Sequence, residues 1–269
     1  MRPLRSLGYR TDVFLCAFDG IVEERDRYLV MRTPSNPNYW WGNYLLYPDA
    51  PAPGDAPTWL ADQARELPGV TGKLIAWDRP DGATGELQDF FDEGFALDDG
   101  TILTAKRGDL RRTSRMTGDV TTVAIRTDAQ WNDMLEVLTN AFTPTRSGTL
   151  EDLRVFTTTQ CSRYRAMQEA NLGQWYGAMV DGELAGALGV VRDREVGRFQ
   201  LIGTDPRFAR RGVCSSLVHD AAALTFERPE IETLVIAADS TYHAAKVYEA
   251  VGFQPTERLV AVIKKPAKS

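Results

Sequence analysis

The sequence is poor in cysteine and histidine, with three cysteines and two histidines in 269 residues. Cys16, Cys161 and Cys214 lie far apart and form no CxxC pair. Neither a disulfide framework nor a structural zinc site is therefore indicated. We expect no metal cofactor and a reducing compartment, the cytoplasm.

Long apolar runs and an excess of positive charge are also missing. No apolar stretch approaches the roughly 18 residues that cross a bilayer. The run Val13–Phe18 superficially resembles part of a signal peptide, but it is short and bracketed by Asp12 and Asp19, so we interpret it as a first strand. The net charge of −6 argues against nucleic acid as a partner and mildly favours cationic substrates. We expect no membrane partner, and a homo-oligomer stays open.

Composition and length favour two globular domains. The sequence is 43% hydrophobic and 25% charged, as in ordinary globular proteins, and a domain usually holds about 100–200 residues. The basic, polar segment Thr104–Thr122 suits a connector. We place the boundary near Gly118, which gives domains 1–117 and 118–269.

Hydrophobic periodicity predicts a mixed α/β pattern in both halves. In the second half we expect strands at 121–127, 174–191 with a turn at Asp181-Gly182, 198–204, 233–238 and 259–265, and helices at 131–142, 215–227 and 242–252. In the first half we expect strands at 13–18, 28–33, 42–48, 73–78 and 101–106, and helices at 57–67 and 85–94.

The two halves superpose at one constant shift of 158 positions (206 − 48). The shift places Pro48 on Pro206, Gly54 on Gly212 and Gly94-Phe95 on Gly252-Phe253. This pattern indicates an internal repeat. The alternative is a chance alignment of glycine, proline and phenylalanine.

The segment Thr204–Leu217 follows an expected strand and opens an expected helix. Gly212 lets the backbone approach a ligand closely, and the free N–H groups of a helix start favour a pyrophosphate. Arg210 and Arg211 add positive charge beside it. The alternative is a plain strand–helix turn with exposed arginines.

At this point the sequence resembles the GNAT superfamily of N-acetyltransferases. The acyl-CoA loop of that family reads Gln/Arg-x-x-Gly-x-Gly/Ala, and here Ala209–Cys214 stands in its place, with Ala209 and Cys214 departing from the pattern. A second block, Ala244–Phe253, resembles the family's Ala-x-x-Leu-Tyr-x-x-x-Gly-Phe helix and turn. Its glycine follows the loop glycine by 40 residues (252 − 212).

The resemblance implies an acetyl-CoA-dependent N-acetyltransferase with two GNAT-like domains, the first degenerate. Each domain would be a mixed, mostly antiparallel sheet flanked by helices. A primary amine, on a small molecule or a peptide, would attack the thioester directly in a ternary complex. Tyr248 would protonate the departing thiolate; the alternative is a tyrosine packed in the core. The residues implied for acetyl-CoA are Ile202, Gly203, Thr204, Arg210, Arg211, Gly212, Val213, Cys214, Ser215, Ser216 and Thr241.

The general base is not identified from the sequence. Family members often carry a glutamate where Arg198 stands here, and Asp193, Glu195 and His243 are nearby in sequence. Cys214 has no accompanying His–acid pattern and is expected to fill a small-residue position.

Two other functions stay open. One is a non-catalytic acyl-CoA-binding or regulatory protein, because Ala209, Cys214 and the missing glutamate depart from the family pattern. The other is a ligand- or peptide-binding surface at the aromatic run 38–42, for which a core strand and turn is the alternative.

Overall fold

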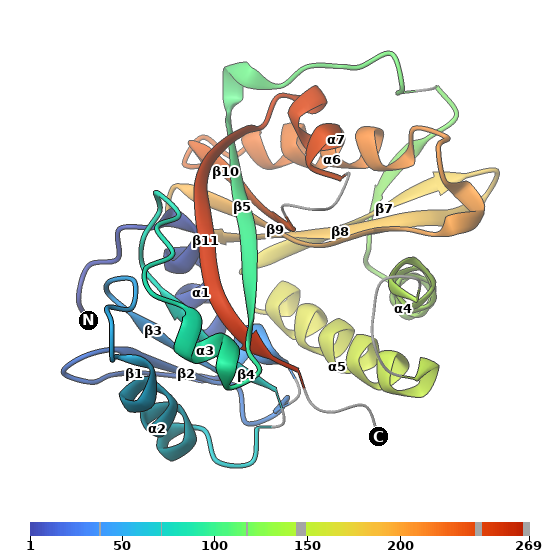
Figure 1. The fold of residues 1–269 in the computed structure, drawn as a ribbon. Coiled ribbons are helices and arrows are strands. Elements are labelled where there is room, and N and C mark those ends of the chain that lie inside the picture. The colour runs from blue at the N-terminus through green and yellow to red at the C-terminus, as the bar shows by residue number, and fades with distance from the viewer. Residues whose placement is uncertain (38, 71, 117, 144–148, 240–243, 266–269) are drawn as a thin grey trace. The chain divides into compact units, whose positions relative to one another are not determined.

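The computed structural model describes residues 1–269 except 38, 71, 117, 144–148, 240–243 and 266–269. The chain forms two compact units, each with its own strands and helices (Figure 1). The first holds Met1–Ile102 with the C-terminal segment from Thr256, and the second holds Leu103–Pro255. The predicted mixed α/β fold is confirmed in both units. No helix among the described residues is long and apolar enough to span a membrane.

The strands of the first unit follow the order β1-β2-β3-β4-β11. They are β1 (Ile21–Glu24), β2 (Leu29–Arg32), β3 (Tyr44–Tyr47), β4 (Lys73–Trp77) and β11 (Gln254–Lys264). Neighbours are antiparallel except β3 and β4, which are parallel. Helices α2 (Ala56–Glu66) and α3 (Gln88–Asp92) cover one face with an aromatic core. On the other face, Tyr9 of α1 (Leu7–Ala17) lies 6.4 Å from Tyr44, measured between ring centroids.

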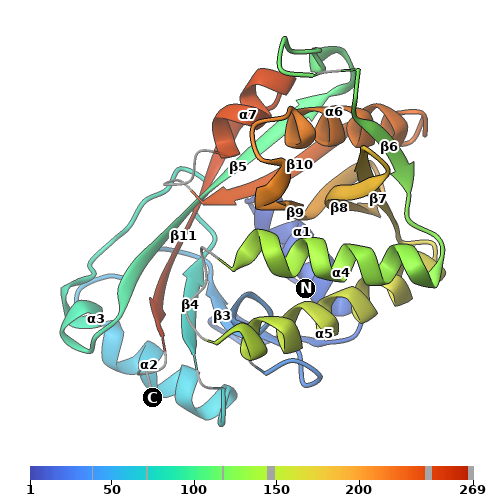
Figure 2. The ribbon, with the colours of Figure 1, turned by 90° about the vertical axis from the view of Figure 1, so that its right-hand side faces the viewer.

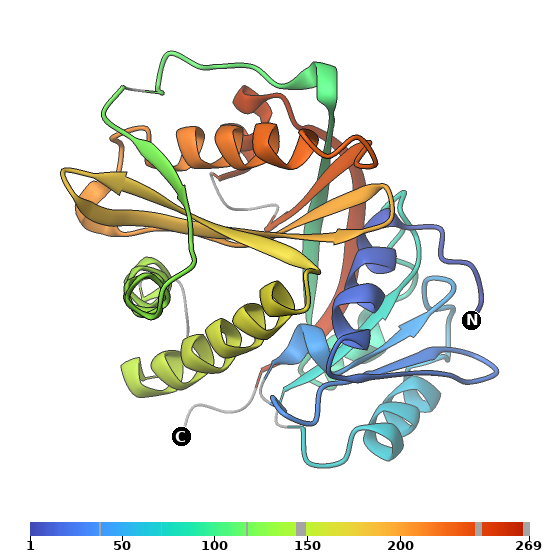
Figure 3. The ribbon, with the colours of Figure 1, turned by 180° about the vertical axis from the view of Figure 1, so that it is seen from behind.

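The strands of the second unit follow the order β10-β9-β8-β7-β6. They are β6 (Thr121–Ala124), β7 (Gly173–Val180), β8 (Glu183–Asp193), β9 (Val196–Thr204) and β10 (Thr233–Asp239). Neighbours are antiparallel except β9 and β10, which are parallel. Helices α4 (Asp128–Phe142) and α5 (Leu150–Glu169) run side by side on one face (Figure 2). Helices α6 (Val213–Phe226) and α7 (Ala244–Val251) cover the other, as Figure 3 shows from behind.

Strands β5 (Ala96–Lys106) and β11 both contain the boundary between the units. Leu103 and Ala105 of β5 are buried in the core of the second unit. Val260 and Val262 of β11 are buried in the core of the first unit, in register with β4. The last strand of each half of the sequence thus contributes to the unit of the other half. The predicted domains 1–117 and 118–269 keep each last strand with its own half.

The shift of 158 positions carries elements of the first half onto elements of the second. The bounds of β5 fall on those of β11, α2 falls on residues 214–224 of α6, and α3 falls on residues 246–250 of α7. Gly54 and Gly212, which precede α2 and α6, have φ of +85° and +79°. The two halves therefore share an element order and a left-handed glycine before one helix.

One helix in each unit differs from the secondary structure that the sequence predicts. The strand predicted at 13–18 is wrong, because these residues lie in or just after helix α1, whose N-terminus is capped by the Ser6 hydroxyl. A short apolar run fits a buried helix face as well as a strand. Helix α5 was not predicted; three consecutive threonines, Thr157–Thr159, weaken its helical signal.

Candidate functional site

Strand β9 contains a bulge near its C-terminal end. The register with β8 changes from Gly189 opposite Gln200 to Ala187 opposite Gly203. Leu188 therefore faces two residues of β9, Leu201 and Ile202, and Leu201 has a φ of +34°. A bulge takes backbone groups out of the ladder. Three residues that the family resemblance implies for the cofactor, Ile202–Thr204, lie directly at and after this irregularity.

Strands β9 and β10 part after a short paired stretch. They pair over Val196–Arg198 and Thr233–Val235, and in the described part of the two strands no later register pair joins them. We call the segment of β9 beyond the last pair, Phe199–Thr204, the open edge of the fork. A strand edge of this kind can bind an extended ligand through its main-chain groups. The geometry of the second unit thus provides such an edge next to the bulge.

The turn after β9 leads into the N-terminus of α6. Arg210 and Gly212 both have left-handed backbone angles, with φ of +62° and +79°. Gly212 has no side chain to cap the helix. The first hydrogen bond of the helix runs from the Ser216 N–H to the Gly212 carbonyl, at 2.9 Å. The N–H groups of Val213–Ser215 precede that bond and point out of the helix end, where an anion is favoured.

The two arginines of the turn differ in their partners. Arg211 pairs with Asp181 at 2.9 Å, and its guanidinium lies 5.7 Å from the ring centroid of Phe208. Arg210 is exposed. Both partners of the Arg211 ion pair are exposed, so the pair adds little to the stability of the turn.

The first turn of α6 is closely packed. Ser215 and Ser216 are buried, and no hydrogen-bond partner is found for the Ser216 hydroxyl within the described part of the chain. Burial raises the pKa of the Cys214 thiol to about 12, so the thiol stays protonated at neutral pH. A protonated thiol is a poor nucleophile, which fits a packing role for Cys214.

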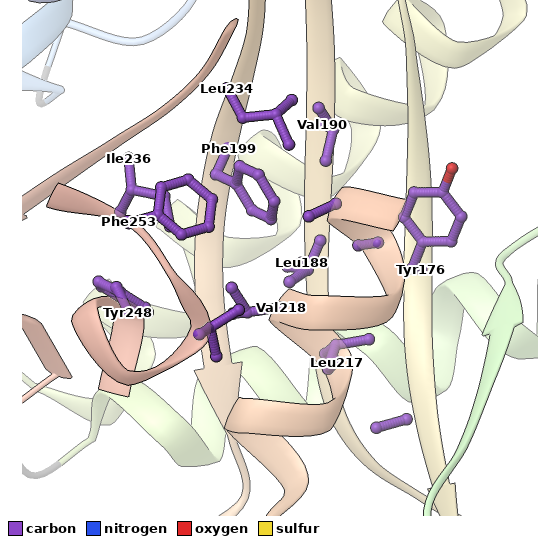
Figure 4. Close-up of a cluster of buried hydrophobic side chains, with 14 of the residues drawn as sticks. Tyr176, Leu188, Val190, Phe199, Leu217, Val218, Leu234, Ile236, Tyr248 and Phe253 are labelled. Carbon is purple, nitrogen blue, oxygen red and sulfur yellow. The ribbon is translucent and has the colours of Figure 1, made fainter. Parts of the chain in front are cut away.

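Tyr248 of α7 lies in the apolar core of the second unit, near Ile236 and Phe253 (Figure 4). The Tyr248 carbonyl accepts the N–H groups of Gly252 and Phe253, at 3.1 and 3.0 Å. Gly252 has a φ of +123°, and a Cβ there would stand 2.0 Å from the Asp109 carbonyl oxygen. The Gly-Phe pair of the Tyr-x-x-x-Gly-Phe block therefore ends helix α7. The Tyr248 side chain is buried, with 5% of its surface exposed.

The residues considered as a base are not gathered at the bulge. Asp193 and Glu195 flank the β8–β9 turn, and Glu195, the nearer of the two, precedes Leu201 by six residues, which corresponds to roughly 20 Å along the strand. The Glu195 carbonyl accepts N–H groups of Glu232 and Thr233 at 2.8 and 3.1 Å. His243, like the implied cofactor residue Thr241, lies outside the described residues.

Asp205 is a site-adjacent carboxylate that the sequence analysis missed. It is 1% exposed and follows Thr204 directly. Burial alone would raise the pKa of Asp205, but hydrogen bonds from Arg207 and Asn140 outweigh it and lower that pKa. A carboxylate held ionised in this way is a weak base. The Asp-Pro pair that opens the 3-10 turn Pro206–Phe208 is the signal that marks it as a cap.

A surface pocket of about 320 Å³ lies beside Asp205 in the second unit. It is lined by Asp133, Glu136, Val137, Asn140, Met179, Gly182, Glu183, Leu184, Asp205 and Arg207. Several of its carboxylates are ion-paired, Asp205 and Glu183 with Arg207 and Glu136 with Arg154. Two arginines thus offset half of the charge of the four carboxylates in the lining.

A comparison with protein-family models finds a match in the second half of the chain. Residues 144–262 match the family model of the acetyltransferase (GNAT) domain. No curated protein matches the chain.

Solved structures resemble the whole chain in fold. A functionally unknown conserved protein from Staphylococcus epidermidis matches 92% of this chain and 95% of its own, with a TM-score of 0.72 and 15% identity. A GCN5-related N-acetyltransferase from Kribbella flavida matches 97% and 96%, with a TM-score of 0.65 and 11% identity. A tandem GNAT protein from the clavulanic acid biosynthesis pathway matches 100% and 90%, with a TM-score of 0.53 and 15% identity.

Proposed function

Because residues 144–262 match the family model of the acetyltransferase (GNAT) domain, we propose that the chain is an acetyl-CoA-dependent N-acetyltransferase acting on a primary amine. The observation that carries the proposal is the succession along β9 and α6. A bulged strand with an open edge runs into a left-handed glycine and an uncapped helix N-terminus. Thioester, extended pantetheine arm and pyrophosphate would each find a matching backbone group along this path.

In this proposal the pyrophosphate binds the N–H groups of Val213–Ser215, beside Arg210 and Arg211. The pantetheine arm lies along the open edge of the fork and brings the thioester carbonyl to the bulge. Backbone N–H groups there are preorganised donors for the oxyanion that forms in the transition state. Thr241 joins the cofactor residues through the family resemblance alone.

The transfer is a direct attack. The amine nitrogen bonds to the thioester carbonyl carbon and loses a proton, the carbon–sulfur bond breaks, and the N-acetylated amine and the CoA thiol are the products. An alkyl amine has a pKa of about 10.4, so its proton must leave to water or a relay before attack. Tyr248 returns a proton to the CoA sulfur. No covalent enzyme intermediate is needed.

The proposal is tested with acetyl-CoA and two matched glycine variants. Acetyl-CoA at about 100 times its dissociation constant should add about 2.7 kcal/mol to the free energy of unfolding. Gly212→Val should abolish this thermal shift, because the left-handed φ and the close approach are both lost. Gly54→Val places the same strain before α2 and should leave the shift intact.

Thiol release from acetyl-CoA with a panel of amines, polyamines, amino acids and peptides then tests catalysis. An unchanged thermal shift in Gly212→Val would place the cofactor elsewhere in the molecule. Binding without thiol release would leave the second candidate, a non-catalytic acyl-CoA-binding protein. The tight burial of Tyr248 and the ion-paired state of Asp205 are the observations that favour that candidate.

The first unit fits a degenerate copy of the same fold. Its β3 stays paired with β4 to its last residue, Tyr47 opposite Trp77, and the Asp78 N–H then donates to the Tyr47 carbonyl at 2.8 Å. No fork opens there. In the loop that corresponds to the phosphate turn, the Asp55 carboxylate accepts the Ala52 N–H at 2.8 Å.

The first half also lacks the chemical groups that the proposal assigns to the second half. Phe90, which has no proton to give, takes the position of Tyr248 under the 158-residue shift. The negative charge of Asp55 repels phosphate at the helix start, and Pro51 and Pro53 supply no N–H donors. We propose that this unit no longer binds acetyl-CoA.

A further inference from the structure

Gly186 of strand β8 packs against the start of helix α6. It is buried, and it is paired with Thr204 at the end of β9. A Cβ atom on Gly186 would stand 2.8 Å from the Val213 Cγ1 atom and 3.1 Å from the Gly203 carbonyl oxygen. A glycine inside a strand often marks the close approach of another element. Here the approaching element is the first residue of α6.

The contact between Gly186 and Val213 leaves no room for a methyl group. Carbon atoms that are not bonded to each other pack about 3.5–4.0 Å apart. Val213 is 1% exposed, and its branched side chain has one strongly preferred rotamer in a helix, so it does not turn aside at low cost. Leu217, one turn further along α6, lies 3.6 Å from the same Cβ position. A side chain at position 186 would therefore push the first turn of α6 away from β8.

The first half of the sequence has a large side chain at the matching position. The shift of 158 carries Gly186 onto Tyr28 (186 − 158). Tyr28 is 2% exposed and belongs to the aromatic core of the first unit, with its ring centroid 5.1 Å from that of Tyr47. A tyrosine thus stands in the first unit where the second unit has a glycine against its helix start.

Resting on the proposed acetyltransferase function, we propose that Gly186 is a positioning residue for the cofactor. It pairs with β9 and packs against α6, so it fixes where the N–H groups of Val213–Ser215 lie relative to the bulge of β9. The pyrophosphate and the thioester belong to one molecule, so the helix start and the bulge must be correctly spaced to bind both. Hydrogen bonds weaken steeply when the donor tilts away from the acceptor. Gly186 acts through Val213 and touches no part of the cofactor itself.

The test uses Gly186→Ala, which adds only one methyl group. The dissociation constant for CoA, measured by titration calorimetry on the intact chain, should rise at least about tenfold, as expected when a hydrogen bond to a charged group is lost. Adding Val213→Ala to this variant removes the Cγ1 atom that the new methyl group meets. The double variant should recover most of the CoA affinity although its free energy of unfolding is lower still. A residue that only packs the core would not separate affinity from stability in this way.

Gly197→Ala is the matched control, because Gly197 of β9 lies against the other end of the same helix. A Cβ atom there would stand 2.6 Å from a Leu234 methyl group and 3.3 Å from the Thr225 Cγ2 atom of α6. This variant should lose stability and keep the wild-type affinity for CoA. An equal loss of affinity in both alanine variants, or no recovery in the double variant, would overturn the assignment to Gly186. If Gly186→Ala does not fold, Val213→Ile crowds the same contact from the helix side and should weaken CoA binding as well.

A measurement without cofactor separates this inference from the proposed function. Hydrogen exchange at the Ser216 amide, the first bonded amide of α6, should quicken in Gly186→Ala and stay unchanged in Gly197→Ala. This result, together with a wild-type protein that does not bind CoA, would reject the proposed function and keep the assignment of Gly186 to the helix start. CoA binding by the wild type, with unchanged exchange and affinity in Gly186→Ala, would reject the inference alone.

Discussion

Two residues of the second unit are buried in the fold and also have polar groups that matter for its chemistry or stability. Tyr248 illustrates this, because its ring is packed in the core while its proposed role requires the hydroxyl to reach the CoA sulfur. Asp205 illustrates it in another way, since its carboxylate is nearly inaccessible and still ionised. Each of these residues supports one prediction.

For Tyr248, we expect Tyr248→Phe to lower turnover by about 10²–10⁴-fold without weakening acetyl-CoA binding. The ring keeps its packing with Phe253 and Ile236, so only the proton donor is lost. Turnover comes from thiol release and the dissociation constant from titration calorimetry. Tyr176→Phe, at another buried tyrosine of the same core, should keep wild-type turnover. Full activity in Tyr248→Phe would leave Tyr248 as a packing residue.

For Asp205, we expect Asp205→Asn to cost about 1–3 kcal/mol of unfolding free energy at pH 7. The native pKa is lowered, so the carboxylate stabilises the fold fully above its unfolded pKa of about 3.9 and less as the pH falls through the lower native value. The difference between wild type and variant should thus be constant from pH 7 to about 5 and shrink below pH 4. Chemical unfolding at several pH values measures it.

Asp133→Asn, at an exposed carboxylate of the same pocket, is the control for this measurement. It should change the unfolding free energy little at any of these pH values. A difference for Asp205→Asn that grows toward acid would contradict the assigned direction.

At the scale of secondary-structure elements, the strand β11 is the most informative. It comes from the second half of the sequence, and yet its register partners are Lys73–Trp77 of β4. Val260 and Val262 fill the aromatic core between β4 and α2. The stability of the first unit therefore depends on residues that follow the whole second unit in the chain.

We expect Val262→Ala to destabilise the first unit rather than the second. Two buried methyl groups are lost, at about 0.8 kcal/mol each, together with the cost of the cavity, so about 2 kcal/mol is expected. Hydrogen exchange should quicken in β4 and α2 and stay unchanged in α6. Ile236→Ala on β10 should show the reverse pattern, because Ile236 lies in the core of the second unit. Faster hydrogen exchange in α6 for Val262→Ala would contradict the assignment of β11 to the first unit.

At the scale of the whole molecule, the two halves of the sequence share an element order and differ in the features along the proposed acetyl-CoA path. The second has a fork, a bulge and an uncapped helix start, whereas β3 and β4 of the first stay paired and its loop satisfies its own N–H group. Net charge is a weak guide at this scale. The value of −6 is a sum over the whole chain and favours cationic substrates only mildly.

We expect one acetyl-CoA to bind per polypeptide. Titration calorimetry on the intact chain should give a stoichiometry near one, abolished by Gly212→Val and unaffected by Gly54→Val. The intact chain is required because each unit contains a strand from the other half of the sequence. A stoichiometry near two would show that the first unit has kept its site.

The sequence by itself determined the features that depend on local spacing. Gly212 and the Tyr-x-x-x-Gly-Phe block predicted the GNAT resemblance of the second half, where the family model matches, and the constant shift of 158 predicted the correspondence of α2 with α6 and of α3 with α7. Local rules decide these features, since a left-handed turn needs glycine and a helix needs its periodic apolar face.

Only the tertiary structure decided the features that depend on which strands meet. The fork at Arg198, the bulge opposite Leu188 and the pairing of β11 with β4 all result from registers between segments far apart in the chain. Helix α1 belongs to the same group, because a six-residue apolar run fits a helix or a strand until a partner surface selects one. The free energy of strand pairing depends on the side chains of the neighbouring strand, so the sequence of one segment does not predict which strand it pairs with.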